Sequence, residues 1–463
     1  MKTAMVLSRR DFLGAAVGLG FGGLRIFAEH PDFSEAFRSH AGVGHGELLA
    51  DPEGLLDLPA GFSYKVIATV GERMSDGFRV PGRADGMAAF PGPGGHALVV
   101  CNHELSSIDQ EFSAFGPDSA MAARMAPAAF YDGCNGKRPC PGGTTTLLYD
   151  TRRQKLKRQH LSLAGTLRNC AGGPTPWNSW VSCEEHVQRA DEVYEKDHGY
   201  NFEVPAAHGR CIMDPMPLKA MGRFNHEAIA VDPKSGCVYQ TEDRGDGVFY
   251  RFVPNRPGQL RMGGRLQALQ VRDKPGLDTR NWEQPAQVPV SEVLAVEWID
   301  AEEVESPDDD LRHRMFTSGA ARFARGEGIW HGRDAVYFAC TNGGRAKKGQ
   351  IWKYMPSPDE SQASETQRPA RLELFIEPND PALVENADNL TVAPWGDLIV
   401  CEDGPATNRL MGVTPRGQVY GLASHHSGSE LAGVTFSPDG STLFVNIQVL
   451  GKTVAITGPW RKA

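Results

Sequence analysis

The chain has 463 residues, of which 40% are hydrophobic and 23% are charged, and its formal net charge is −9. This length exceeds the usual size of a single hydrophobic core, although the composition is ordinary for a globular protein. The acidic balance, with no long basic run, argues against a nucleic acid as the main partner. The 52 glycines and 32 prolines are typical of an all-β, turn-rich chain.

The first residues have the pattern of an export signal. Arg9 and Arg10 precede an apolar, glycine-rich stretch over residues 12–24, which is too short to span a bilayer stably. A chance arginine pair is the alternative, but its position predicts a twin-arginine signal peptide over residues 1–28. We therefore expect export by the twin-arginine translocase, a periplasmic or secreted protein without a stable membrane span, and a single domain over residues 29–463.

A strand–turn–strand unit recurs six times along the rest of the chain. Each copy has a polar first residue, a short apolar strand, a turn with Gly, Pro or Asp, a second apolar strand, and then an acid or amide. The copies span residues 85–104, 170–185, 227–242, 327–342, 388–403 and 430–446. A recurring hairpin predicts radial repetition. The expected fold class is therefore all-β, a six-bladed β-propeller.

The segments between the repeats predict how the ring is closed and covered. Strand-like residues 62–70 and 453–460 are expected to pair, which would remove the open edge of the ring. Two longer stretches, residues 186–223 and 255–325, interrupt the rhythm, and the second contains a charged, helix-like piece at 293–305. Long insertions in repeat folds usually leave from one face and often cover a site there.

The nine cysteines divide by position. Cys134 and Cys140 share a Gly- and Pro-rich loop and, after export, could form a local disulfide or remain free. Cys170 differs, because it lies at the polar start of a repeat. The cysteines in or beside second strands are interpreted as small buried hydrophobes: Cys101, Cys183, Cys237, Cys340 and Cys401.

The repeat boundaries are expected to meet at one end of the central channel. So many carboxylates in one place would resist ionising unless bound cations removed the repulsion. Calcium prefers oxygen ligands, whereas a thiolate among carboxylates indicates a softer, more Lewis-acidic metal, of which iron is one candidate. The candidate metal ligands are Cys170, Glu185, Glu227, Glu242, Glu327, Asp388 and Glu402.

These acids have a structural alternative, because acids at strand ends often only hydrogen-bond the backbone of turns. Six copies at near-constant spacing favour the metal site, since turns alone do not require long carboxylates such as Glu185 or Glu227. The sequence has no G-x-S-x-G elbow, no P-loop and no zincin motif. His103, His226 and His425 are interpreted as packing residues or as supports of the site.

Several runs of the sequence resemble the PhoX-type alkaline phosphatases and their relatives, in the order of that family. They include SRRDFLG, GTLRNCAGG, SWVSCEE, MGRFNHEAIAVDP, ARGEGIW and ENADNL, and the similarity covers nearly the whole mature chain. The resemblance implies a six-bladed propeller that is exported by the twin-arginine route. It also implies hydrolysis of small-molecule phosphate monoesters by a cluster of Fe(III) and Ca²⁺ ions.

The resemblance further implies roles for individual residues. Arg325 resembles the arginine that contacts the phosphate, and it is the expected catalytic residue; the family's Arg-Pro-Glu reads Arg325-Gly326-Glu327 here. The implied iron ligands are Cys170, Glu227 and Glu327, and the implied calcium or bridging ligands are Glu185, Asp388 and Glu402.

Two other functions stay open at this point. A calcium-dependent propeller hydrolase would act on lactones or phosphotriesters with calcium alone. A non-catalytic propeller would bind a partner protein, as many repeat folds do, and would not depend on the acidic residues. We expect a monomer.

Overall fold

The computed structural model describes residues 43–136, 138–209 and 214–461. The signal peptide expected over residues 1–28 lies outside these ranges. Within them, no helix has both the length and the apolar character needed to cross a membrane.

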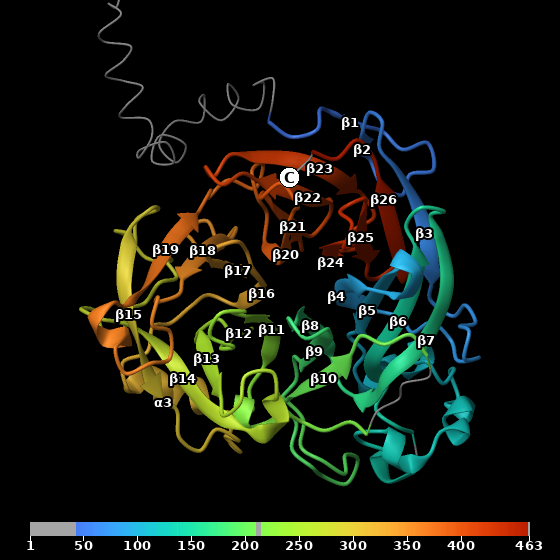
Figure 1. Ribbon diagram of the computed structural model, residues 1–463, viewed down its shortest axis with the longest axis horizontal. Coiled ribbons are helices and arrows are strands. Elements are labelled where there is room, and N and C mark those ends of the chain that lie inside the picture. Colours follow the sequence, from blue (N-terminus) through green and yellow to red (C-terminus); the bar gives the residue numbers. More distant parts are fainter. Residues whose placement is uncertain (1–42, 137, 210–213, 462–463) are drawn as a thin grey trace, which may run out of the picture.

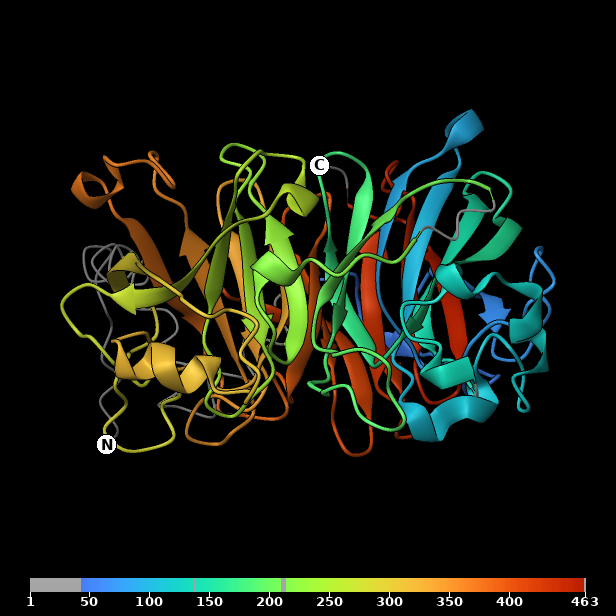
Figure 2. The ribbon, with the colours of Figure 1, turned by 90° about the horizontal axis from the view of Figure 1, so that it is seen from below.

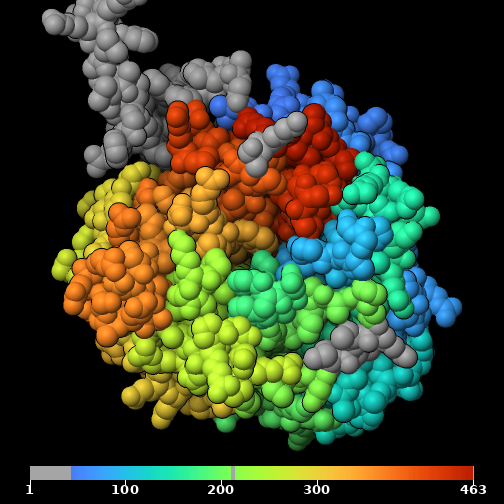
Figure 3. All heavy atoms as spheres, in the orientation of Figure 1, coloured from blue at the N-terminus to red at the C-terminus, as the bar shows by residue number. Residues whose placement is uncertain are grey.

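Sheets stand side by side around a common centre in a propeller-like arrangement (Figure 1). The six expected strand pairs are present as antiparallel hairpins. Their first strands contact one another in chain order, and the contact between β24 and β4 closes the ring. Chain order is also the spatial order on the surface (Figure 3). The first strands are β4 (Ala84–Pro91), β8 (Asn169–Pro174), β11 (His226–Val231), β16 (Gly326–His331), β20 (Ala387–Val392) and β24 (Leu431–Phe436). The second strands are β5 (Ala97–His103), β9 (Ser179–Glu184), β12 (Val238–Glu242), β17 (Val336–Cys340), β21 (Leu398–Glu402) and β25 (Thr442–Ile447).

Outer strands extend each hairpin away from the centre. The pairing of β26 (Lys452–Thr457) with β3 (Ser63–Thr69) joins the two ends of the chain in one sheet, which confirms the expected closure. The other outer strands are β6 (Gly142–Asp150), β7 (Lys155–Thr166), β10 (Asn201–Pro205), β13 (Tyr250–Pro254), β14 (Gly264–Val271), β18 (Gln350–Met355), β19 (Ala370–Ile376), β22 (Asn408–Val413) and β23 (Val419–His425). A small two-stranded sheet is made by β1 (Leu48–Leu49) and β2 (Leu58–Pro59).

One sheet has nine strands, because β15 (Val293–Asp300) lies between β14 and β19 and pairs with both. The prediction of a helix-like piece at residues 293–305 is therefore wrong. Leu294 and Val296 are buried while Val293 is exposed, an alternation with the period of a strand. The inserted segment has its α-helix further on, as α3 (Leu311–Thr317).

Short helices cover several connections. In Figure 2, α3 (gold) and the 3₁₀ helices between β5 and β6 (cyan) lie on the same side of the disc. From α3, the Nη1 of Arg312 lies 3.8 Å from the Oε1 of Glu242, at the inner end of β12. The 3₁₀ helices are η1 (Pro93–Gly95), η2 (Ser107–Phe112), η3 (Ala120–Arg124), η4 (Pro127–Ala129), η5 (Cys134–Gly136), η6 (Lys219–Met221), η7 (Leu260–Met262) and η8 (Glu365–Gln367).

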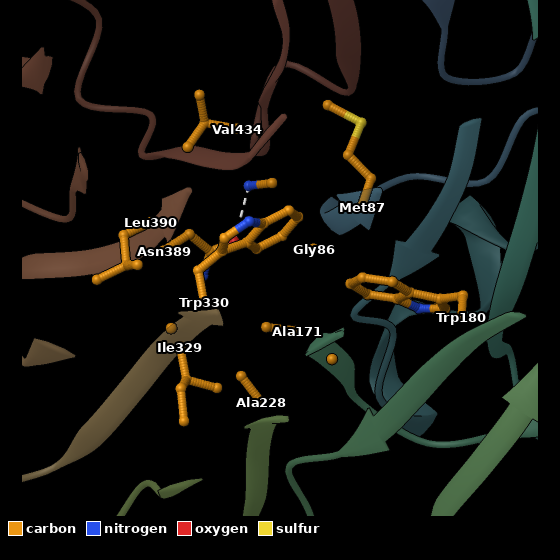
Figure 4. A pocket seen from close by; sticks show the side chains of 13 residues that line it. Gly86, Met87, Ala171, Trp180, Ala228, Ile329, Trp330, Asn389, Leu390 and Val434 are labelled. Atoms are coloured by element: carbon orange, nitrogen blue, oxygen red, sulfur yellow. Dashed lines mark hydrogen bonds between the residues drawn. The ribbon is translucent and has the colours of Figure 1, made fainter. Parts of the chain in front are cut away.

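The first strands approach one another so closely that glycine is required at the centre. A Cβ on Gly86 would lie 2.5 Å from the Cα of Ala171, and one on Gly433 would lie 2.1 Å from the carbonyl oxygen of Asp85. The space that remains is a cavity of about 20 Å³ lined mostly by small and apolar side chains, with Asn389 among them (Figure 4), enough for about one water molecule. The middle of the ring is thus narrow, and polar residues gather where the first strands begin.

Candidate metal centre

Five side chains reach the inner end of the ring from the second position of a first strand. The pairing register shifts around this position in every one of these strands, and a β-bulge of this kind re-aims side chains. The five residues are Asp85, Cys170, Glu227, Glu327 and Asp388. Glu430, directly before β24, supplies the corresponding carboxylate of the sixth hairpin.

A second set of acids comes directly after the last residue of a second strand. Because neighbouring residues of a strand point to opposite faces, only one acid of each doubled pair reaches the centre. Asp403 joins the central cluster, whereas Glu402, which ends β21, accepts two hydrogen bonds from Arg409 inside its own sheet. The acids of this second set are Glu104, Glu185, Asp243 and Asp403.

Four groups of potential ligand atoms form a chain around the centre because they share members. Within each group the ligand atoms lie within 4.8 Å of one another. We call their members together the central ring. The groups are Asp85, Glu104 and Cys170; Cys170, Glu185 and Glu227; Glu227, Glu327 and Asp388; and Asp388, Asp403 and Glu430.

Glu227 belongs to two of these groups and has the environment of a metal ligand. Both of its carboxylate oxygens are buried without a hydrogen-bond partner in the described part of the chain. Burial, together with the carboxylates of Glu185 and Asp388, raises its pKa well above the usual value. A buried carboxylate without donors is strongly disfavoured as an anion unless a cation neutralises it. These residues therefore fit a bound metal.

The same causes act on three further members of the central ring. Burial and the Asp403 carboxylate raise the pKa of Asp388 to about 7. Burial and the Asp85 carboxylate raise the pKa of Glu430 to about 11, and they also raise the pKa of the Cys170 thiol. Many carboxylates with a single thiol suit hard cations such as calcium together with one softer, more Lewis-acidic metal.

Three arginines stand directly before first strands, and all three have left-handed backbone: Arg83 (φ 47°), Arg168 (φ 43°) and Arg325 (φ 51°). Such a conformation is uncommon outside glycine and tends to cluster at functional sites. Arg168 pairs with Glu104 and, at 2.6 Å, with Glu185. The Arg168 guanidinium thus offsets part of the negative charge of the central ring.

Arg325 is held from two sides. Its Nε and Nη2 donate to the two carboxylate oxygens of Asp243, at 2.7 and 2.9 Å. Its Nη2 also lies 2.8 Å from the Oε1 of Glu327. The side chain keeps 38% of its surface exposed, so the guanidinium is oriented by acids and still accessible to a ligand.

Among the residues singled out by the sequence, the structure brings five ligand candidates into the central ring and places two elsewhere. The Oε2 of Glu242 accepts hydrogen bonds from the backbone N–H of Val248 and the hydroxyl of Tyr250. Its Oε1 is buried without a hydrogen-bond partner in the described part of the chain but faces the Arg312 guanidinium at 3.8 Å. Glu402 pairs with Arg409, as described above. The five in the ring are Cys170, Glu185, Glu227, Glu327 and Asp388.

Sequence reasoning did not select every member of the site. Asp243 and Arg168 were missed, although Asp243 directly follows Glu242 and Arg168 stands in the same place before its strand as Arg325 does. Pairs of neighbouring acids at the ends of second strands could have indicated these positions, since one residue of each pair points to each face of the strand. Four residues marked the repeat boundaries without being chosen as ligands: Asp85, Glu104, Asp403 and Glu430.

Comparison with known proteins covers most of the chain. A family model described as "Alkaline phosphatase PhoX" matches residues 43–451. The fold is similar to that of Pseudomonas fluorescens PhoX in complex with vanadate, a transition state analogue, with a TM-score of 0.67 and 19% identity over 90% of this chain and 98% of that one. A gluconolactonase from Xanthomonas campestris matches with a TM-score of only 0.41 and 11% identity, over 91% of this chain and 100% of that one. No curated protein sequence matches the chain.

Proposed function

The chain belongs to the PhoX family of alkaline phosphatases, and from that premise we propose that it is a metal-dependent phosphatase acting on small-molecule phosphate monoesters. The observation that carries this proposal is the unpartnered, buried carboxylate of Glu227 at the middle of the central ring. Arg325 stands beside that ring with an exposed guanidinium. An acidic protein can bind an acidic substrate at such a place, because bound cations invert the local field.

The family resemblance implies that Cys170, Glu227 and Glu327 would hold Fe(III), and a thiolate suits an ion that is softer and more Lewis-acidic than calcium. The oxygen ligands Glu185 and Asp388 would hold Ca²⁺. For Glu242 and Glu402, which the sequence also suggested, the contacts within their sheets favour a structural role. Asp403 and Glu430 take their place as proposed calcium ligands, and Asp85 and Glu104 complete the ring beside Cys170.

The bound cations would supply positive charge for the phosphate oxygens and would lower the pKa of an oxygen nucleophile. Phosphoryl transfer depends mainly on positioning and charge stabilisation, so the side chains chiefly orient the substrate. Asp243 holds the Arg325 guanidinium through Nε and Nη2, which leaves Nη1 available to a phosphate oxygen. Arg168 is held differently, because its Nη2 alone contacts both Glu104 and Glu185.

We also infer the blade count and the export route. The nine-stranded sheet divides into two four-stranded blades joined through β15, which would give six blades in all. The arginine pair near the N-terminus supports export by the twin-arginine translocase to the periplasm or beyond.

The test is elemental analysis of protein purified after native export without chelators, followed by assays on three ester classes. We expect iron and several calcium ions per chain, hydrolysis of phosphate monoesters, and loss of that activity after chelation. Calcium alone, with activity on lactones or phosphotriesters, would support the calcium-only hydrolases instead. Protein without tightly bound metal would refute the enzyme assignment and favour a binding propeller.

A further inference from the structure

A second cluster of metal-ligating side chains lies away from the central ring. Asp132 and Cys140 belong to the connection between β5 and β6, and His198 belongs to the connection between β9 and β10. Their ligand atoms lie within 4.8 Å of one another. All three residues are buried, with exposed fractions of 0% for Asp132 and His198 and 1% for Cys140.

A second thiol adjoins this cluster. The Sγ of Cys134 lies 3.3 Å from the Sγ of Cys140, and both cysteines are free and buried. The Sγ of Cys140 lies 3.9 Å from the Nε2 of His198. Two thiols, an imidazole and a carboxylate are thus gathered in one buried place, and each of these groups is a zinc ligand.

We propose that Asp132, Cys134, Cys140 and His198 form a closed binding site for a single Zn²⁺ ion, separate from the central ring. The Nε2 of His198 lies 3.3 Å from the Oδ2 of Asp132. A tetrahedral ion with bonds of about 2.0 Å to both atoms would separate them by about 3.3 Å. The Sγ of Cys140, 3.9 Å from the same Nε2, is a third ligand beside this pair, and the adjoining Cys134 thiol would be the fourth.

The orientation of His198 supports this assignment independently. Its other ring nitrogen, Nδ1, lies 2.7 Å from the Oε1 of Glu184. Metal-bound histidines usually donate this second N–H to a carboxylate, which fixes the tautomer and aims the free nitrogen at the metal. Glu184 is itself held by the backbone N–H groups of Leu167 and Gly199. Glu184 is therefore a positioning residue for His198.

The site would clamp together two long connections that flank the central ring. Glu184, which orients His198, is followed directly by Glu185, a member of the central ring. A closed tetrahedral ion contributes folding energy and has no open position for a substrate. The role of the zinc site is therefore structural, and it does not depend on the phosphatase proposal.

The test is zinc content measured beside iron and calcium, on natively exported protein. We expect about one zinc per chain in the wild type and its loss in Cys134→Ser/Cys140→Ser, with iron and calcium retained. Cys237→Ser replaces an equally buried cysteine in a different hydrophobic cluster, so this control should keep its zinc.

A second measurement uses only the wild type, in case the double variant does not fold. Cobalt exchanged for zinc should give thiolate-to-metal charge-transfer absorption, and Cys134 and Cys140 should resist alkylation until a chelator is added. Non-reduced peptide mapping that links Cys134 to Cys140 would overturn the proposal in favour of a disulfide. Native protein that contains no zinc and gives no thiolate–cobalt absorption would overturn it as well.

Discussion

The two ends of strand β11 carry acids in opposite situations. Asp232, at the turn end, accepts hydrogen bonds from the backbone N–H groups of Lys234 and Ser235 and from the Ser235 hydroxyl. Glu227, at the ring end, has both oxygens buried and unpartnered in the described part of the chain. A turn satisfies its own carboxylate, so only the ring end requires a cation. The supply of donors, more than the presence of an acid, separates a metal ligand from a structural acid.

The largest effect on activity is expected from a substitution at the ring end of β11. Glu227→Gln removes a charge from the middle of the central ring, and we expect kcat/KM to fall by more than about 100-fold, since changing even the outer partners of metal ligands costs 10- to 100-fold. Iron content should fall with activity. Asp232→Asn, at the other end of the same strand, is the matched control and should keep both. Equal retention of metal in the two variants would contradict the assignment.

A different outcome is expected for Glu402, whose carboxylate is bound within its own sheet. Glu402→Gln leaves the Arg409 guanidinium without its carboxylate, and loss of one partner of a buried ion pair destabilises by about 3 kcal/mol. Urea unfolding should therefore show a lower midpoint, while the metal content of the folded protein stays at the wild-type value. Metal loss with an unchanged midpoint would return Glu402 to the ligand set.

The next prediction concerns Arg325 and the binding of phosphate. Arg325→Ala removes a charged hydrogen-bond donor, worth about 1.5–3 kcal/mol, and we expect inhibition by inorganic phosphate to weaken by about 10- to 100-fold. Arg325→Lys should restore only part of the loss, because an ammonium group cannot make the bidentate contact with Asp243 that orients this side chain. Arg314→Ala on α3, which removes an ion pair with Asp310, serves as control. Unchanged phosphate inhibition in Arg325→Ala would exclude its proposed role.

Most of the fold could be predicted because its signals are local. Alternating apolar residues and turn residues mark each hairpin, and terminal strands at residues 62–70 and 453–460 predict the closure that β3 and β26 make. The long sheet could not be predicted in this way. Its bridging strand β15 alternates like a strand, but its place in the sheet is set by pairing with β14 and with the distant β19, and its own sequence does not identify those partners.

The ligands could be predicted where a single polar residue begins a repeat. They were ambiguous where two neighbouring acids end a repeat. Cys170 and Glu227 each lie one residue inside a first strand, so the repeat itself marks them. Which of Glu402 and Asp403 points to the centre depends on the alternation of side chains at the end of β21. The irregular pairing of β20 with β21 shifts the register there. The cluster at His198 joins two separate connections, and only the spacing of Cys134 and Cys140 hinted at it.

The smallest effect is expected at the turn end of the last hairpin. Burial alone would raise the pKa of Asp439, but hydrogen bonds from the hydroxyls of Ser437, Ser441 and Thr151 lower it to about 2. A carboxyl with a lowered pKa in the folded state stabilises the protein above the unfolded value, near 4, and loses that contribution as the pH falls through about 2. The side chain is exposed, so solvent screening limits the contribution to about 1 kcal/mol or less. Asp439→Asn should therefore flatten the free energy of unfolding between pH 4 and 2 by this small amount. An unchanged pH profile would mean that this carboxylate, although it has the donors that Glu227 lacks, gains nothing from them.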